Sequence, residues 1–186
     1  MSDYTPRLSA AGIRYDYKWY SDNPFYLAGY GMPNCTAYAW GRFWEIAGGT
    51  SARKPTLSTG NAEDWYSHTS DGYTRNRRTP KLGAIACYRD GIYSGYGHVA
   101  VVEAIYQDGS FLVSESAYEG YFFRATHICQ ANGTYDDVSG YVFQGFIYNP
   151  YAGDTPSPDP PVTGGNLKWW LSNYQLKVME GGGFIL

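Results

Sequence analysis

The sequence lacks several features that would assign a function class at once. Its 186 residues contain no apolar run approaching the ~20 residues that a membrane-spanning helix needs. Residues 1–6 show no basic start followed by an apolar stretch, so we expect no secretory signal peptide. The net charge is −3, and the only run of neighbouring basic residues is Arg75, Arg77 and Arg78. Both observations argue against a nucleic-acid partner.

Cysteine is scarce as well. The 3 cysteines, Cys35, Cys87 and Cys129, are odd in number and widely spaced, which excludes a disulfide framework. No CxxC or HxxxH spacing occurs, so we expect no zinc site and no cofactor. One cysteine is a candidate nucleophile, and we expect the other two to be small buried residues.

Aromatic residues, in contrast, are abundant, with 20 Tyr and 6 Trp. Such rings fill protein cores, and at a surface they suit ligands that are apolar on one face and polar at the edge. The length allows one domain with a proper core and is short for two. We therefore expect a single folded domain over residues 1–150.

The order of the predicted elements favours an α+β fold. Residues 36–47 have apolar positions at helical spacing and end at Gly48-Gly49, and residues 62–67 predict a short helix capped by Asn61. Alternating and β-branched residues predict five strands, over 83–88, 98–106, 111–116, 121–126 and 140–148. This order indicates N-terminal helices packed on a central antiparallel sheet of about five or six strands.

The C-terminal part differs in composition. Residues 151–165 are rich in Pro and Gly and predict a stiff, extended linker. Beyond it, Trp170, Leu171 and Tyr174 share one helical face with Leu167, so residues 166–186 predict a short amphipathic tail. A segment of this length does not form a stable domain alone.

Cys35 lies where the loop of residues 31–34 meets the first predicted helix. A thiol at a helix N-terminus is close to the positive end of the helix dipole, which favours the thiolate. Unpaired backbone N–H groups at the same place can stabilise an oxyanion. Without a base nearby, the better interpretation of Cys35 would be a buried structural cysteine.

His98 is the candidate base. It follows Gly97 at the first position of a predicted strand, where a rigid sheet can hold its ring. An adjacent imidazole activates a thiol and later protonates the leaving amine. His68, in a polar loop, and His127, at the end of a strand, are weaker candidates.

The base usually needs an acceptor for its second ring nitrogen, and Glu115 is the candidate. A two-residue Asp108-Gly109 turn would place Glu115 opposite Val102, on the same face as His98. In this register the two residues lie about 13 Å apart along the strand, so a longer turn or a bulge must shift the pairing. Glu103 is the poorer candidate, because its odd offset from His98 points it to the other face.

Four segments together resemble the CHAP family, the cysteine- and histidine-dependent amidohydrolases/peptidases. They are residues 34–40 (NCTAYAW), 80–88 (PKLGAIACY), 97–103 (GHVAVVE) and 108–116 (DGSFLVSES). In that family a Cys opens the first helix, the GHVA segment carries the His, and a third residue follows about a hairpin later. The resemblance covers roughly residues 20–150, and residues 23–31 and 144–148 look like those of CHAP domains from phages of Gram-positive bacteria.

The resemblance implies a papain-like fold and hydrolysis of an amide bond in bacterial peptidoglycan, either the N-acetylmuramoyl–L-alanine amide or a bond of the peptide stem or bridge. Cys35 would be the nucleophile, His98 the base and Glu115 the third catalytic residue. The Cys35 N–H and the Asn34 side chain would hold the oxyanion. Four aromatic side chains are expected to line the substrate groove: Trp40, Trp65, Tyr96 and Tyr118.

Some members of the family bind calcium in an acidic loop before the Cys. Asp16 and Asp22 stand alone here, so we expect no metal site. The expected partner is peptidoglycan, reached from the host cytoplasm as a phage endolysin released through a holin pore, or as part of a virion. Residues 166–186 would then be free to contact a phage tail or wall-binding partner. Two alternatives stay open: a non-catalytic wall-binding module and a structural module of a phage tail.

Overall fold

Two helices precede a run of strands. The computed structural model describes residues 4–91, 95–129, 135 and 140–153. Helices α1 (Pro24–Leu27) and α2 (Cys35–Ile46) come first and are followed by 3₁₀ turns at Ser51–Arg53, Ala62–Asp64 and Thr69–Asp71. The strands are β1 (Arg75–Asn76), β2 (Ile85–Asp90), β3 (His98–Ile105), β4 (Phe111–Glu115), β5 (Arg124–Ile128) and β6 (Tyr141–Ile147).

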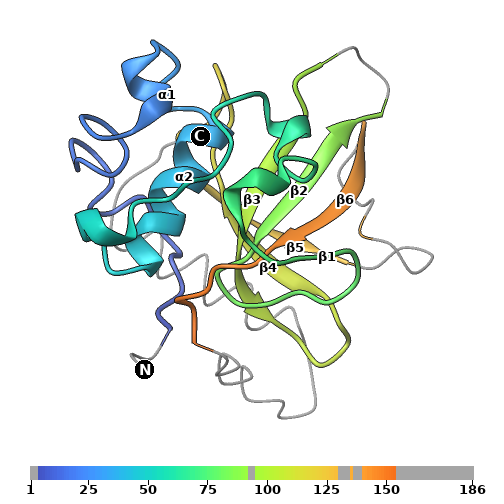
Figure 1. Cartoon of the computed structure of the whole chain (residues 1–186). Coiled ribbons are helices and arrows are strands. Elements are labelled where there is room, and N and C mark those ends of the chain that lie inside the picture. The colour runs from blue at the N-terminus through green and yellow to red at the C-terminus, as the bar shows by residue number, and fades with distance from the viewer. Residues whose placement is uncertain (1–3, 92–94, 130–134, 136–139, 154–186) are drawn as a thin grey trace, which may run out of the picture.

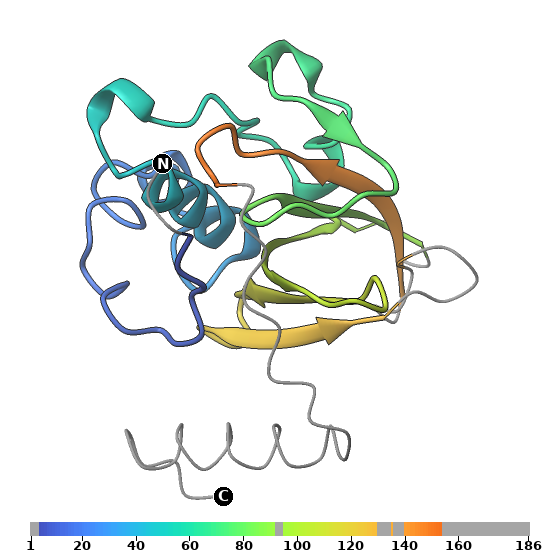
Figure 2. The ribbon, with the colours of Figure 1, turned by 90° about the horizontal axis from the view of Figure 1, so that it is seen from below.

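Within the described residues, the strands form one six-stranded antiparallel sheet in the order β1-β6-β2-β3-β4-β5. Helix α2 packs beside the sheet, chiefly against β3, and the N-terminal segment runs along the outer side of α2 (Figure 1). Figure 2 shows the sheet curving from β6 round to β5. The expected α+β arrangement, with helices on an antiparallel sheet of about five or six strands, is confirmed.

Successive side chains of a strand alternate between the two faces of the sheet. In this sheet both faces carry buried apolar side chains. One set packs toward the helices and includes Ile85, Cys87, Val99, Val101 and Ile147. The other set fills the concave side and includes Ala86, Tyr88, Ala100, Val102 and Phe146. The position of His98 in this alternation places it on the face of Ala100 and Val102.

The loops before α2 belong to the core. Trp19 is fully buried, and its indole Nε1 donates to the Tyr38 carbonyl of α2 over 3.1 Å. Gly41 permits this close approach, because a Cβ at that position would lie 2.5 Å from the Trp19 ring. Much of the aromatic content therefore serves packing of the N-terminal segment against α2.

Several helix and strand boundaries differ from those predicted from the sequence. The first helix begins at Cys35, one residue earlier than expected, and Gly48 follows it with a left-handed φ of 90°. The helix expected over 62–67 is only a 3₁₀ turn of Ala62–Asp64, because the Asn61 side chain makes no capping bond. The strand expected over 121–126 lies at Arg124–Ile128, where it pairs with β4, and the two-residue β1 was not predicted.

Most of the residues covered by the C-terminal predictions lie outside the described part of the chain. The predicted linker, residues 151–165, passes out of the described residues after 153, and the predicted tail of residues 166–186 lies wholly outside them. In the part of the chain that the structure describes, no helix has the length and apolar character to cross a membrane.

A β-bulge in the β3–β4 hairpin sets the position of Glu115. Val101 pairs with Ser114 and Val102 with Val113, whereas Ala104 pairs with Leu112, so Glu103 is the extra residue. If the pairing continues for one residue beyond Val101 and Ser114, Glu115 lies beside Ala100 and not beside Val102. The predicted register was therefore wrong by two residues, in the direction that brings Glu115 toward His98. The bulge accounts for one of them, and the turn accounts for the other because Tyr106 bonds Ser110 and leaves three residues in the turn instead of two.

The bulge residue anchors a buried ion pair. Glu103 is fully buried and accepts from Arg42 of α2, with Nε–Oε1 at 2.9 Å and Nη2–Oε2 at 2.8 Å. Ser114 Oγ donates to the same carboxylate over 2.6 Å and Tyr4 OH over 2.7 Å. The pair thus ties the helix that begins at Cys35 to the strand that begins at His98.

Loss of Glu103 should be severely destabilising. Glu103→Ala would leave the buried Arg42 guanidinium with only the partly exposed Glu45 as counter-charge, and we expect it to lower the free energy of unfolding by about 3–5 kcal/mol. Glu45→Ala is the matched control, because Glu45 also pairs with Arg42 but its side chain is 27% exposed, so we expect a loss of only about 1 kcal/mol. Urea unfolding of both variants checks this, and equal losses would contradict it.

Candidate active site

Cys35 is the first residue of α2, at the junction of loop and helix where the sequence placed it. Asn34 caps the helix from an extended conformation, and its Oδ1 accepts from the N–H groups of Thr36 at 2.8 Å and Ala37 at 3.4 Å. No acceptor among the described residues bonds the Cys35 N–H. That N–H therefore lies beside the thiol as a free donor at a helix N-terminus.

His98 is the first residue of β3 and is 8% exposed. Gly97 precedes it with a left-handed φ of 71°, and a Cβ there would lie 2.5 Å from the Tyr88 carbonyl oxygen and 2.6 Å from the Glu63 nitrogen. Glycine is required at this position because two backbone segments approach it closely. The tight passage fixes where β3 starts and so where the imidazole lies.

Glu115 and His98 are in direct contact. His98 Nε2 lies 2.5 Å from Glu115 Oε2, and both side chains are buried. The other ring nitrogen, Nδ1, is left for the Cys35 thiol, which lies close enough to the imidazole to raise its pKa. The structure thus gathers the three residues that the sequence singled out, one from α2, one from β3 and one from β4, and we call them the relay.

The second oxygen of Glu115 is held from β5. Oε1 accepts from Arg124 Nη2 at 2.9 Å and Nε at 3.1 Å, and from the Thr126 hydroxyl. Arg124 and Thr126 were not predicted as site residues from the sequence. They alternate along β5, which pairs with β4 through Glu115 and Arg124, so a correct β5 register would have found them.

These contacts shift the pKa values of the relay. Burial lowers the pKa of His98, but hydrogen bonds and negative charge from Cys35 and Glu115 outweigh burial and raise it. Burial raises the pKa of Glu115, but the hydrogen bond and charge of His98, the Thr126 hydroxyl and the Arg124 charge outweigh that effect and lower it. The site therefore favours the imidazolium form of His98 beside the ionised carboxylate of Glu115.

The loop after β4 supports the helix cap. The Asn34 N–H donates to Ser116 Oγ at 3.1 Å, and Ser116 Oγ donates to the Tyr121 carbonyl oxygen at 3.1 Å. Asn34 is buried, and its Oδ1 is occupied by the helix. Its expected contribution to an oxyanion site would have to come from Nδ2.

The expected groove residues divide into two pairs. The prediction that Trp40 and Trp65 line the groove was wrong. These side chains are 2% and 0% exposed and pack within the core, so neither offers a ring face to a ligand. Tyr96 and Tyr118 are 74% and 56% exposed and remain available for contact. The error arose because aromatic richness alone does not distinguish core from surface.

The remaining histidines and cysteines lie apart from the relay. His68 bonds Ser70, and His127 bonds Ser110. Cys87 is buried as expected, but Cys129, which directly follows β5, is exposed. In the described part of the chain, no three His, Cys, Asp or Glu side chains gather in a way that could hold a metal ion.

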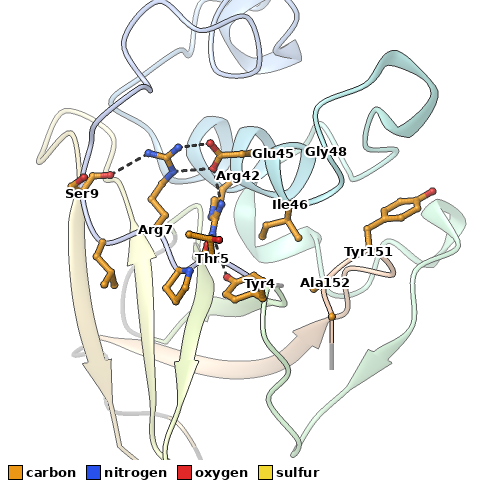
Figure 3. A pocket seen from close by; sticks show the side chains of 13 residues that line it. Tyr4, Thr5, Arg7, Ser9, Arg42, Glu45, Ile46, Gly48, Tyr151 and Ala152 are labelled. Atoms are coloured by element: carbon orange, nitrogen blue, oxygen red, sulfur yellow. Dashed lines mark hydrogen bonds and ion pairs between the residues drawn. The ribbon is translucent and has the colours of Figure 1, made fainter. Parts of the chain in front are cut away.

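A cavity of about 460 Å³ lies elsewhere, at the end of α2 remote from Cys35. Figure 3 shows that its charged groups face one another, with Arg7 bonded to Glu45 and Arg42 turned inward. It contains neither a thiol nor an imidazole. The cavity therefore belongs to the support of α2 and not to the reactive relay.

Comparison with known proteins identifies the family. The CHAP domain matches residues 25–117, half of the chain, and the chain belongs to this family. A putative hydrolase of Streptococcus mutans is 49% identical over 61 residues, which are 32% of this chain and 27% of that protein. The probable autolysin LDP of Staphylococcus aureus is 32% identical over 110 residues, 59% of this chain and 36% of that protein.

A structural neighbour is the crystal structure of an N-acetylmuramoyl-L-alanine amidase from Staphylococcus aureus. It is 28% identical, with a TM-score of 0.42, and the match covers 53% of this chain and 29% of that one. The chain thus spans roughly a third of the length of the curated relatives it matches.

The pKa shifts predict a defined pH dependence of stability. The raised pKa of His98 contributes stability that is complete below the ordinary value of 6.5 and is lost as the pH rises. The lowered pKa of Glu115 contributes stability that is complete above 4.5 and is lost as the pH falls. The stability advantage of the natural chain over Glu115→Gln should therefore be greatest between pH 4.5 and 6.5.

Urea unfolding from pH 3 to 9 measures this difference. Thr126→Val is the control, because it removes one bond to Glu115 and keeps both charges, so its stability deficit should vary less with pH. A Glu115→Gln deficit that stays constant across this range would rule out the charge pairing.

Proposed function

We propose that this chain hydrolyses an amide bond of bacterial peptidoglycan, with Cys35 as nucleophile, His98 as acid–base and Glu115 as the residue that orients the imidazole. The observation that carries the proposal is the relay of thiol, imidazole and carboxylate, with His98 Nε2 2.5 Å from Glu115 Oε2. Membership of the CHAP family supports the substrate class.

In the first half of the reaction, the Cys35 thiolate attacks the amide carbonyl carbon and forms a C–S bond. The negative charge moves to the carbonyl oxygen, where the Cys35 N–H donates, with Asn34 Nδ2 as a second donor. The His98 imidazolium then transfers its Nδ1 proton to the amide nitrogen. The C–N bond breaks, the amine leaves, and a thioester remains on Cys35.

In the second half, water attacks the thioester carbonyl. Neutral His98 takes a proton from the water as it adds, the C–S bond breaks, and the carboxylic acid product leaves. The thiolate and the imidazolium are regenerated. Throughout the cycle Glu115 accepts from Nε2, which keeps Nδ1 directed at the thiol.

A second candidate is a wall-binding module without catalysis, favoured by the exposed rings of Tyr96 and Tyr118. In that case the relay would be a structural ion pair. A phage origin, either as a released endolysin or as part of a virion tail, is a further proposal that rests on the resemblance of residues 23–31 and 144–148.

The test is clearance of purified Gram-positive cell walls. Cys35→Ala should reduce the rate by roughly a thousandfold or more, because no other group in the relay can form the thioester. Cys129→Ser is the matched control, since it removes an exposed thiol away from the relay, and it should clear walls at the natural rate. Equal clearance by Cys35→Ala would disprove the nucleophile assignment.

A further inference from the structure

A group of exposed tyrosines lies on the loops that lead into Cys35. Tyr15, Tyr26, Tyr30 and Tyr118 are 82%, 45%, 57% and 56% exposed, and Tyr20 lies among them partly buried. We call these five residues the tyrosine face. Four of them come from the segment before α2, and the fifth comes from the loop after β4, three residues beyond Glu115.

The rings contact one another in two groups. The centroids of Tyr15 and Tyr20 are 6.0 Å apart, those of Tyr20 and Tyr26 are 5.3 Å apart, and those of Tyr30 and Tyr118 are 6.5 Å apart. We call the group of three rings and the group of two rings the two parts of the row; neither is a scatter of single exposed side chains.

A cleft is lined by residues from both parts of the row. Its volume is about 350 Å³, and its lining includes Tyr26, Tyr118, Met32 and Pro33. This volume falls within the range of about 300–1,000 Å³ found for small-molecule sites. Because Pro33 is two residues before Cys35, their Cα atoms can be at most about 7 Å apart, so part of the cleft lining lies close to the nucleophile.

The backbone at both ends of the face is strained. Among the described residues, only two other than glycine have a positive φ, Tyr15 at 66° and Glu119 at 54°. A bulky residue in this region costs conformational energy, and such residues concentrate at ligand sites. At Tyr15 the strain holds an aromatic ring out in solvent, where packing does not compensate for it. Glu119 lines the cleft next to Tyr118.

The chemistry of the face fits a sugar better than a peptide. Tyrosine offers an apolar ring face and a hydroxyl at its edge, which matches the C–H face and the peripheral hydroxyls of a pyranose. A stem peptide would require partners for its amides and its charged groups. Among the residues that line the cleft, Glu119 alone is charged.

We propose that the tyrosine face binds the glycan strand of peptidoglycan. This inference rests on the proposed function and refines it. With sugars in the cleft beside Pro33, the amide that reaches Cys35 is the one nearest the glycan, between the lactyl group of the muramoyl sugar and the first alanine of the stem. The bond cleaved is then that of an N-acetylmuramoyl-L-alanine amidase.

Binding is tested separately from catalysis. The full chain carrying Cys35→Ala is titrated with soluble glycan strands from which the peptides have been removed, and in parallel with free stem peptides. Glycan strands should bind and stem peptides should not. Adding Tyr30→Ala and Tyr118→Ala should weaken glycan binding at least tenfold, whereas Tyr151→Ala, an exposed tyrosine that lies under Arg53 outside the face, should leave it unchanged.

Tyr15→Gly separates a binding role from a structural one. Glycine relieves the left-handed strain, so the variant should melt at the same or a higher temperature than the natural chain and yet bind glycan strands more weakly. Unchanged glycan affinity in this variant and in the Tyr30→Ala, Tyr118→Ala variant would overturn the proposal.

Product analysis of walls digested by the natural chain tests the bond. Stems that carry a new N-terminal alanine, released from intact glycan, support the inference. Cleavage within the stem or bridge, or wall clearance without any glycan binding, would overturn it and leave the proposed hydrolysis intact. Glycan binding through the tyrosine face with no wall clearance would instead refute the proposed hydrolysis, and the bond assignment with it.

Discussion

The buried pair of Arg42 and Glu103 is the interaction on which the arrangement of the site depends. Arg42 lies seven residues after Cys35, about two helical turns along α2, and Glu103 lies five residues after His98 on β3. Their contact fixes the helix against the strand. Glu103 is also the bulged residue, and its insertion moves the pairing of β4 by one position, while the three-residue turn between Tyr106 and Ser110 moves it by another. The pair therefore bears on both the approach of the thiol to the imidazole and the reach of the carboxylate.

The relay is held from every side by backbone or by paired side chains. Asn34 caps the helix that begins with Cys35, Gly97 sets the start of β3, and Arg124 with Thr126 occupies the oxygen of Glu115 that His98 does not use. Such support favours one orientation of the imidazole, with Nε2 at Glu115 and Nδ1 directed to the thiol. The proposed acid–base role of His98 requires this orientation. The sheet alone would not provide this, because the three reactive side chains come from three separate elements.

The placement of two of the candidate site residues was predictable from the sequence because it depends on local signals. A cysteine at a helix start and a histidine at a strand start are visible in the pattern around Cys35 and His98. The position of Glu115 was not predictable, because it depends on one extra residue in the turn and one inserted residue at Glu103, and no local pattern marks the bulge. Trp40 and Trp65 were misplaced for a related reason, since their burial depends on loops that pack from elsewhere in the chain. The hydrogen bonds from Arg124 and Thr126 of β5 to Glu115 were not predicted, because that strand begins three residues later than its composition suggested.

The central claim is that Cys35 reacts as a thiolate paired with the His98 imidazolium. The most direct measurement is the rate at which iodoacetamide alkylates Cys35 at pH 7, in a Cys129→Ser background that leaves Cys87 buried and Cys35 as the accessible thiol. The account predicts fast alkylation that slows at least tenfold when His98 is replaced by alanine in a chain that remains folded. The same alkylation rate with and without His98 would contradict it.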